Sequence, residues 1–337
     1  MTSERHGFAE KQFLFAFAIS AAFFLLLAMA LRLWPLTAKQ WDEPERRSVL
    51  EALPPDEVTA WKLSYALSAP AFDIGLFGNS RTFGLGRQHL VTDRSFYNFS
   101  VGGMSFRNGI AMLETLAAAG KAPRLAVLAV DYAELGLPGI LPVTPAFHIR
   151  LRNNIDDILA LAGQHQYRGT AIQVVEVIYA EARHYALALN PFYIAAKLRV
   201  MGLLPIEGRS PRTQLDGSRI QYPRNYPLKA FEARRRSDRY LLEDRDFSRL
   251  QQLQGKGIQI ILFETALFPE YMDKQEKILS RNAADFRMRM TQACSKYGIL
   301  CLPAPRLSED PDQWEDDNHP LPAALAPWFQ DTVLNRH

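Results

Sequence analysis

The chain has 337 residues, of which 48% are hydrophobic and 22% are charged, so we expect a packed globular body rather than a disordered polypeptide. A formal net charge of +3 is too small to indicate nucleic-acid binding by itself. Because the sequence has no Cys-x-x-Cys pair and no histidine cluster at ligand spacing, we expect no structural metal.

An apolar helix over residues 13–31 is the first predicted element. The run FLFAFAISAAFFLLLAMAL has 19 residues, and Ser20 is its only polar one. With a rise of about 1.5 Å per residue it spans roughly 28 Å, close to the hydrocarbon core of a bilayer. A buried soluble helix and a signal peptide cleaved near Ala30 are the alternatives. We favour an uncleaved anchor, with residues 1–34 as a cytoplasmic tip and transmembrane helix, because the run continues through the cleavage-like sequence.

Residues 35–70 contain several prolines and one predicted helix, and we interpret them as a stalk leading into the main domain, residues 71–337. Within that domain, short apolar runs alternate with helical spacing. The predicted strands cover 72–77, 96–101, 125–130, 258–263 and 299–302. The predicted helices cover 105–119, 247–253, 274–296 and 321–334. This alternation indicates the α/β class, with a doubly wound parallel sheet covered by helices on both faces.

An insertion over residues 135–245 separates the third strand from the fourth. Its first part is helical, with predicted helices over 155–161, 171–189 and 191–203. Its second part, about 205–240, is rich in proline and arginine and has little periodicity. This second part is either a solvated surface rich in loops or a lid that holds an anionic polymer or anionic lipid headgroups.

Candidate catalytic residues follow the strands, at the edge where parallel sheets bind ligands. Ser80 comes directly after the first strand in a Gly-Asn-Ser turn, and Gly103 follows the second strand. Near the C-terminus, Asp316 and His319 are three residues apart, so that both can lie on one turn with the carboxylate bonded to one ring nitrogen. Each signal is weak alone, and their joint order is more specific. No G-x-G-x-x-G follows the first strand, so no dinucleotide cofactor is expected.

The order of these blocks resembles the SGNH (GDSL-like) hydrolase superfamily, whose fold is a flavodoxin-like three-layer sandwich. Leu76-Phe77-Gly78-Asn79-Ser80 matches its nucleophile block, Asn98 to Gly103 matches its oxyanion block, and Asp316 with His319 matches its last block. The resemblance covers about 70–134 and 245–335 and leaves out the insertion. The anchor and the variant G-N-S-R-T turn are most similar to the anchored proteins of bacterial polysaccharide acetylation and teichoic-acid D-alanylation systems.

This resemblance implies a Ser80–His319–Asp316 triad without cofactor, and an oxyanion hole made by the Ser80 and Gly103 amides. It implies an esterase or O-acyltransferase whose partner is an acylated carbohydrate polymer, with a single-pass anchor in the inner membrane and a periplasmic body. The third block departs from the pattern, because Asp131 follows the third strand where the family has an asparagine donor. Asn79, Arg81 and Asp131 are therefore candidate oxyanion or substrate contacts. A non-catalytic module that binds polymer or joins an envelope assembly is the alternative.

Cys294 and Cys301, seven residues apart, are either two small buried side chains or a disulfide, which an exported body permits.

Overall fold

The computed structural model describes residues 36–104, 106–130, 189–206, 211–222, 244–278, 280–316 and 318–336, with 15–27, 30, 31, 34 and isolated positions between 155 and 178. Most of the insertion lies outside these residues. The predicted helices over 155–161 and 171–189 and most of the basic stretch therefore stay predictions. The predicted helix over 191–203 is found as α8 (Pro191–Val200).

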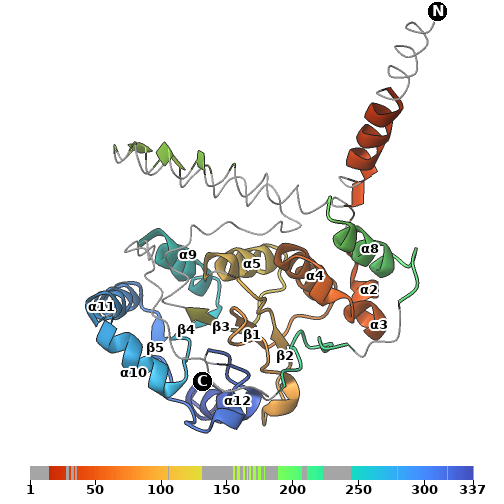
Figure 1. Cartoon of the computed structure of the whole chain (residues 1–337). Helices are drawn as coiled ribbons and strands as arrows, with labels where there is room; N and C mark the ends of the chain where they lie inside the picture. The colour runs from red at the N-terminus through yellow and green to blue at the C-terminus, as the bar shows by residue number, and fades with distance from the viewer. Residues whose placement is uncertain are drawn as a thin grey trace, which may run out of the picture.

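Five parallel strands form one sheet in the order β2-β1-β3-β4-β5 (Figure 1). Their bounds are β1 (Ile74–Phe77), β2 (Phe96–Asn98), β3 (Leu125–Val130), β4 (Gln259–Glu264) and β5 (Leu300–Leu302). At the start of β1, Ile74 is in register with Phe96 of β2 and with Leu125 of β3. This strand order is that of flavodoxin-like doubly wound sheets, in which the winding reverses between β1 and β3. The predicted parallel α/β sheet is confirmed.

The central strand β3 is buried on both faces, as its uninterrupted apolar sequence predicts. Ala126, Leu128 and Val130 belong to one hydrophobic cluster, while Leu125, Val127 and Ala129 belong to a second cluster on the opposite face. This period of two is the pleat of a strand. The two clusters are the two halves of the core.

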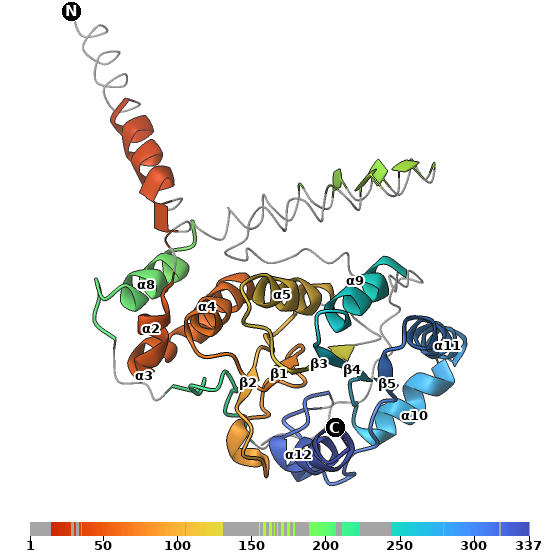
Figure 2. The same ribbon diagram turned by 180° about the vertical axis from the view of Figure 1, so that it is seen from behind.

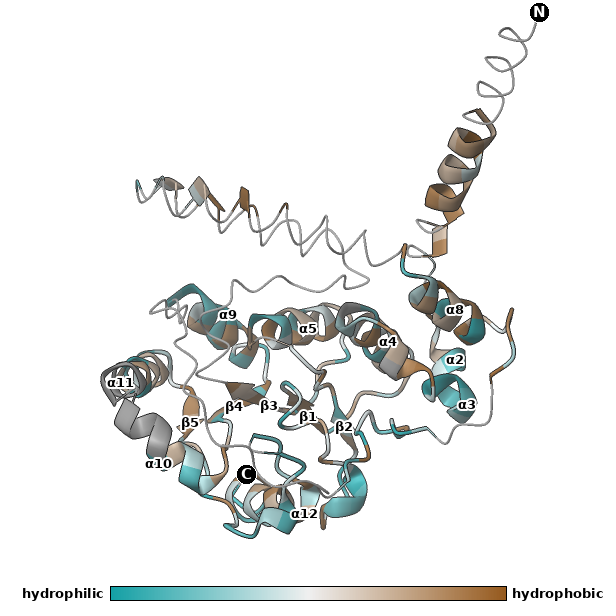
Figure 3. Ribbon diagram, viewed as in Figure 1, coloured by the Kyte–Doolittle hydropathy of each residue, from teal (hydrophilic) through white to brown (hydrophobic). Residues whose placement is uncertain are grey.

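Helices cover both faces of the sheet, as the two opposite views show (Figures 1 and 2). The first face carries α4 (Pro55–Ser68), α5 (Phe106–Ala118) and α9 (Asp244–Gln254). The second carries α12 (Pro322–Trp328) and the π-helix that follows it (Phe329–Leu334). Figure 3 shows apolar strands in the interior, whereas α9 is largely hydrophilic along its outer side.

Where one helix over 274–296 is predicted, the structure has two helices, α10 (Pro269–Ile278) and α11 (Ser280–Tyr297).

The segment interpreted as a stalk packs into the first cluster. Besides α4 it forms α2 (Ala38–Asp42), α3 (Pro44–Arg47) and a short 3-10 turn (Leu50–Ala52). Trp41 and Trp61 have no exposed surface, and their rings meet edge to face with centroids 5.2 Å apart. Residues 36–68 therefore belong to the same core as the sheet. Large aromatic rings such as these supply much of the area that a core buries.

The apolar run 13–31 is described over part of its length, as a helix over 15–27 whose hydrophobic colour is evident in Figure 3. Among the described residues, no helix combines the length and the hydropathy that crossing a bilayer demands.

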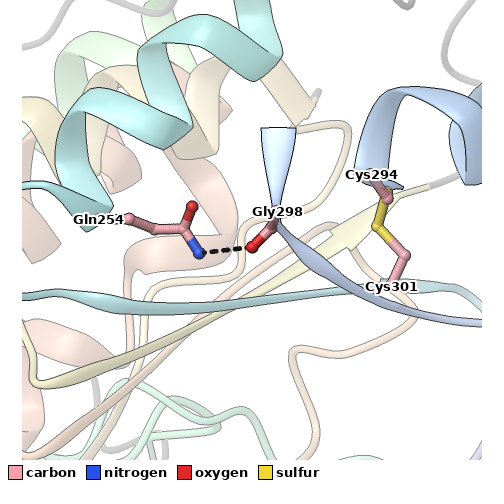
Figure 4. The surroundings of a disulfide bond; sticks show 4 residues. All are labelled: Gln254, Cys294, Gly298 and Cys301. Carbon is pink, nitrogen blue, oxygen red and sulfur yellow. Dashed lines mark hydrogen bonds between the residues drawn. A yellow bond between two sulfur atoms is a disulfide. The ribbon is translucent and has the colours of Figure 1, made fainter. Parts of the chain in front are cut away.

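A disulfide joins Cys294 at the end of α11 to Cys301 in β5 (Figure 4). The two Cα atoms are 6.1 Å apart, within the usual range for a disulfide. Beside it, the Gln254 side chain donates to the Gly298 carbonyl over 3.3 Å, so that the ends of α9 and α11 are linked. Of the two alternatives for these cysteines, the structure has the disulfide.

Candidate active site

Ser80 lies three residues beyond β1, next to the place where the winding of the sheet reverses. In open α/β sheets the crevice at this reversal is the usual ligand site. The loop before α12, which contains Asp316 and His319, reaches the same edge, because His319 Nε2 is 2.8 Å from Ser80 Oγ. Residues separated by 239 positions in the sequence are thus in hydrogen-bond contact.

The three polar side chains form one continuous chain of hydrogen bonds. His319 Nδ1 is 2.7 Å from each carboxylate oxygen of Asp316, and its other ring nitrogen faces the Ser80 hydroxyl. When Nδ1 carries the ring proton, Asp316 accepts it in a hydrogen bond and Nε2 accepts from Ser80. This tautomer gives the arrangement in which a serine hydroxyl can lose its proton to an imidazole.

Asp316 is held by its own backbone as well as by the ring. One carboxylate oxygen accepts the amides of Asn318 and His319 over 2.9 and 3.0 Å. Burial raises the pKa of Asp316, but the hydrogen bond and charge of His319 and these two amides outweigh it, so the pKa is lowered overall. The carboxylate is therefore ionised at neutral pH, as orienting an imidazole requires.

Backbone pairing fixes the loop that contains His319. Trp314 and Pro320 form an isolated antiparallel bridge, and the Glu315 amide donates to the His319 carbonyl over 2.9 Å. Trp314 is fully buried, and its indole donates to the Ser308 carbonyl. The Phe83 ring packs against the imidazole, with ring centroids 6.2 Å apart. The ring of His319 is thus held by a bonded loop and by a stacked neighbour.

The loop that contains Ser80 depends on Gly78, but for space rather than for a positive φ angle. A Cβ atom there would lie 2.3 Å from Thr82 Oγ1 and 2.9 Å from the Ala129 side chain. After Ser80 the chain makes a turn, in which the Thr82 amide donates to the Asn79 carbonyl over 3.2 Å, and no helix begins. The direction of the Ser80 amide is therefore set by this turn rather than by a helix N-terminus.

The Ser80 and Gly103 amides are the predicted oxyanion donors. The Val101 amide donates to the Gly78 carbonyl over 3.0 Å, which holds the segment before Gly103 beside the loop that contains Ser80. Gly103 is exposed and has a φ of +72°, a conformation that favours glycine. Within the described part of the chain, neither amide donates to a protein acceptor. Both amides are therefore available to a ligand.

The three other candidate contacts have different surroundings. Asn79 is 3% exposed, and its side-chain oxygen accepts the Arg81 amide over 2.9 Å, so it shapes the turn. The Arg81 guanidinium donates to Thr265 Oγ1, just beyond β4, over 3.0 Å. Asp131 lies outside the described residues, so its predicted role is not tested.

Lys62 was not predicted from the sequence, although it binds the loops around the site. Its ammonium donates to the carbonyls of Asn98, Ser100 and Gly217 over 3.0, 2.6 and 2.7 Å. Burial, opposed by the charge of Asp216 and assisted by that of Arg219, lowers the pKa of Lys62 to about 7. A lysine in the middle of a helix usually lies on the surface, so no local signal distinguishes this one.

A hairpin over 211–222, from the predicted insertion, closes one side of the site. It pairs Thr213 with Arg219 and lies against the edge strand β2, whose Asn98 amide donates to the Asp216 carbonyl over 2.8 Å. The Arg219 amide donates to the Phe83 carbonyl over 2.7 Å, and its guanidinium carbon is 4.9 Å from the Phe83 ring centroid. Part of the insertion is therefore built into the site.

Gln221 of this hairpin lies between the two loops. Its amide nitrogen donates to Glu315 over 3.0 Å, beside His319. Its amide oxygen packs so closely on Gly84 that a Cβ there would lie 1.7 Å away. The hairpin thus contacts the loop that contains Ser80 and the loop that contains His319.

The chain matches no family model, no curated protein and no solved structure. Among the described residues, no three His, Cys, Asp or Glu side chains are grouped so as to hold a metal ion. The hydrogen-bonded Ser80, His319 and Asp316 side chains are therefore the feature of the described structure that points most directly to a function.

Proposed function

We propose that this chain is an SGNH-type serine hydrolase, an esterase or O-acyltransferase that acts on acyl esters of an extracytoplasmic carbohydrate polymer. The observation that carries the proposal is the chain of hydrogen bonds from Ser80 through His319 to Asp316, with distances of 2.8 and 2.7 Å. These contacts have the geometry of an activated nucleophile, its general base and an orienting carboxylate. Their location at the reversal point of the sheet, where ligands usually bind, gives further support.

In the proposed reaction, Ser80 Oγ attacks the ester carbonyl carbon while its proton passes to His319 Nε2. The carbonyl oxygen becomes an oxyanion that the Ser80 and Gly103 amides stabilise. When the tetrahedral intermediate collapses, the C–O bond of the alcohol breaks and His319 returns the proton to the leaving oxygen. A water molecule or a sugar hydroxyl then attacks the acyl-serine and loses its proton to His319. As the bond between the acyl carbon and Ser80 Oγ breaks, His319 returns this proton to Oγ and the free acid or the new ester is released.

The extracytoplasmic location is part of the proposal and rests on two features. The apolar run over 13–31 has the length and composition of an anchor. The Cys294–Cys301 disulfide is of a kind that persists outside the reducing cytoplasm. With the inner membrane holding the N-terminus, a polymer in the periplasm is the substrate class within reach.

A second candidate function is a non-catalytic SGNH-like module that binds polymer or joins an envelope assembly. The observation that favours it is Asp131 in place of the asparagine that donates to the oxyanion in the resembled family. Loss of one such donor lowers kcat by about 10²–10³. On this alternative the chain would keep the fold and the polymer site without turnover.

Hydrolysis of p-nitrophenyl acetate by the full-length chain tests the proposal. We expect turnover by the wild type and a loss of about 10³-fold or more in Ser80→Ala. Ser68→Ala, which removes an exposed hydroxyl at the end of α4, should retain wild-type activity. Equal rates in the wild type and Ser80→Ala, or no turnover in either, would refute the catalytic proposal. Acetylated glycans, with and without an added acceptor glycan, then distinguish release of free acid from acyl transfer.

A further inference from the structure

A groove of about 570 Å³ lies beside the candidate active site, between the hairpin 211–222 and α12. This volume is within the range of small-molecule sites. Neither Ser80 nor His319 is among the residues that line the groove. Nothing in the catalytic proposal assigns it a role.

Two of the residues that line the groove, Leu321 and Arg219, also support the surroundings of His319. Leu321 comes two positions after the histidine, and its amide donates to the Gln313 carbonyl over 2.9 Å. Arg219 lies over the Phe83 ring that packs on the imidazole. The groove is therefore continuous with the structure around His319 rather than remote from it.

The walls of the groove are mainly aliphatic. They include Val91, Ile220, Leu321, Pro322, Ala323 and Ala326. The rest of the lining is Pro327 and five polar residues, Gln88, His89, Arg219, Gln221 and Gln330, but most of the exposed surface of the groove is apolar. A carbohydrate needs hydrogen-bond partners for hydroxyl groups all around its rings, whereas an alkyl chain needs only apolar contact. The lining therefore fits an alkyl chain better than a sugar.

We propose that this groove binds the aliphatic acyl chain of the ester that Ser80 cleaves. This inference rests on the proposed function and narrows its substrate class to esters whose acyl group is longer than acetyl. The carbohydrate part of the substrate would then lie outside the groove. Each methylene that leaves water for the groove should raise kcat/KM about fourfold.

The kinetic test compares p-nitrophenyl acetate, butyrate and hexanoate on the full-length chain. We expect kcat/KM to rise about sixteenfold with each added pair of methylenes. Ala323→Trp places an indole in the groove at an exposed position of α12, where a larger side chain should not disturb folding. It should abolish the preference for hexanoate over acetate. Ala118→Trp, at the exposed end of α5, is the matched control and should keep the preference.

A binding measurement keeps the test independent of turnover. Calorimetry should detect decanoate binding to the wild type and to Ala118→Trp, with at least about tenfold weaker binding to Ala323→Trp. Equal rates on all three esters, or equal decanoate binding by both tryptophan variants, would overturn the groove inference while leaving acetate hydrolysis intact. If no ester is hydrolysed, the proposed function fails, and decanoate binding alone decides whether the groove is an alkyl site.

Discussion

Replacement of Asp316 by asparagine changes one oxygen of the hydrogen-bonded triad and little else. The retained side-chain oxygen can still accept the Asn318 and His319 amides, which bond to Asp316 over 2.9 and 3.0 Å. The new NH₂ group, however, faces His319 Nδ1, where the carboxylate now accepts a proton over 2.7 Å. The retained oxygen is also 2.7 Å from Nδ1, but it already accepts two backbone amides, whereas the new NH₂ group can only donate. Donation from this NH₂ group to Nδ1 should move the ring proton to Nε2. It can then no longer accept the proton of Ser80.

The expected loss is large because the wrong tautomer blocks the first chemical step. The lowered pKa of Asp316 keeps the carboxylate ionised through neutral pH, so the wild type has the productive tautomer under assay conditions. The corresponding change in serine proteases lowers kcat by about 10⁴, equivalent to about 5 kcal/mol of transition-state stabilisation. We expect a similar loss in kcat for Asp316→Asn, with KM little changed, because the carboxylate touches the histidine rather than the substrate.

Steady-state hydrolysis of an activated ester by the full-length chain measures this effect. Asp312→Asn is the matched control, because Asp312 is exposed in the same loop, and its activity should equal that of the wild type. Thermal unfolding of both variants shows whether the fold is retained. If Asp316→Asn keeps its kcat within about threefold of the wild type, the role assigned to the carboxylate is wrong.

Two further predictions concern stability. The folded chain releases the Lys62 proton near pH 7, whereas an unfolded lysine keeps it to about 10.5, so the unfolding free energy should rise with pH between these values. Urea unfolding at pH 7, 8 and 9 should show a shallower rise in Lys62→Met, and identical slopes would contradict the assigned pKa. Joint replacement of Cys294 and Cys301 by alanine should lower the unfolding free energy by about 2 kcal/mol, because the disulfide closes a short loop with a sequence separation of 7. No change in the urea midpoint would show that the bond contributes nothing.

The sheet could be predicted from the sequence because its signals are local. The run Leu125–Val130 is apolar throughout, and β3 has the same bounds. The second strand is shorter than predicted and ends at Asn98, whose side-chain oxygen accepts the Ser100 amide. Ser80 and His319 could be paired because both follow strands, and parallel strands end at one edge.

The parts that escaped prediction depend on contacts between distant segments. Lys62 has its partners 36, 38 and 155 positions away, and nothing in its own helix distinguishes it from a solvated lysine. Trp41 also belongs to a segment that, taken alone, resembles a proline-rich stalk, yet its indole donates to Leu215 in the hairpin over 3.1 Å. Burial and partners are properties of the assembled fold, so periodicity and composition do not reveal them.

The central claim is that Ser80 is an activated nucleophile, and covalent labelling tests it most directly. A fluorophosphonate reacts with a serine whose proton a neighbouring base accepts, and peptide mass spectrometry locates the phosphonyl group. We predict one adduct on the peptide that contains Ser80, and at least about 10³-fold slower labelling in His319→Gln. An unmodified Ser80 peptide, or labelling at the same rate in His319→Gln, would contradict this account.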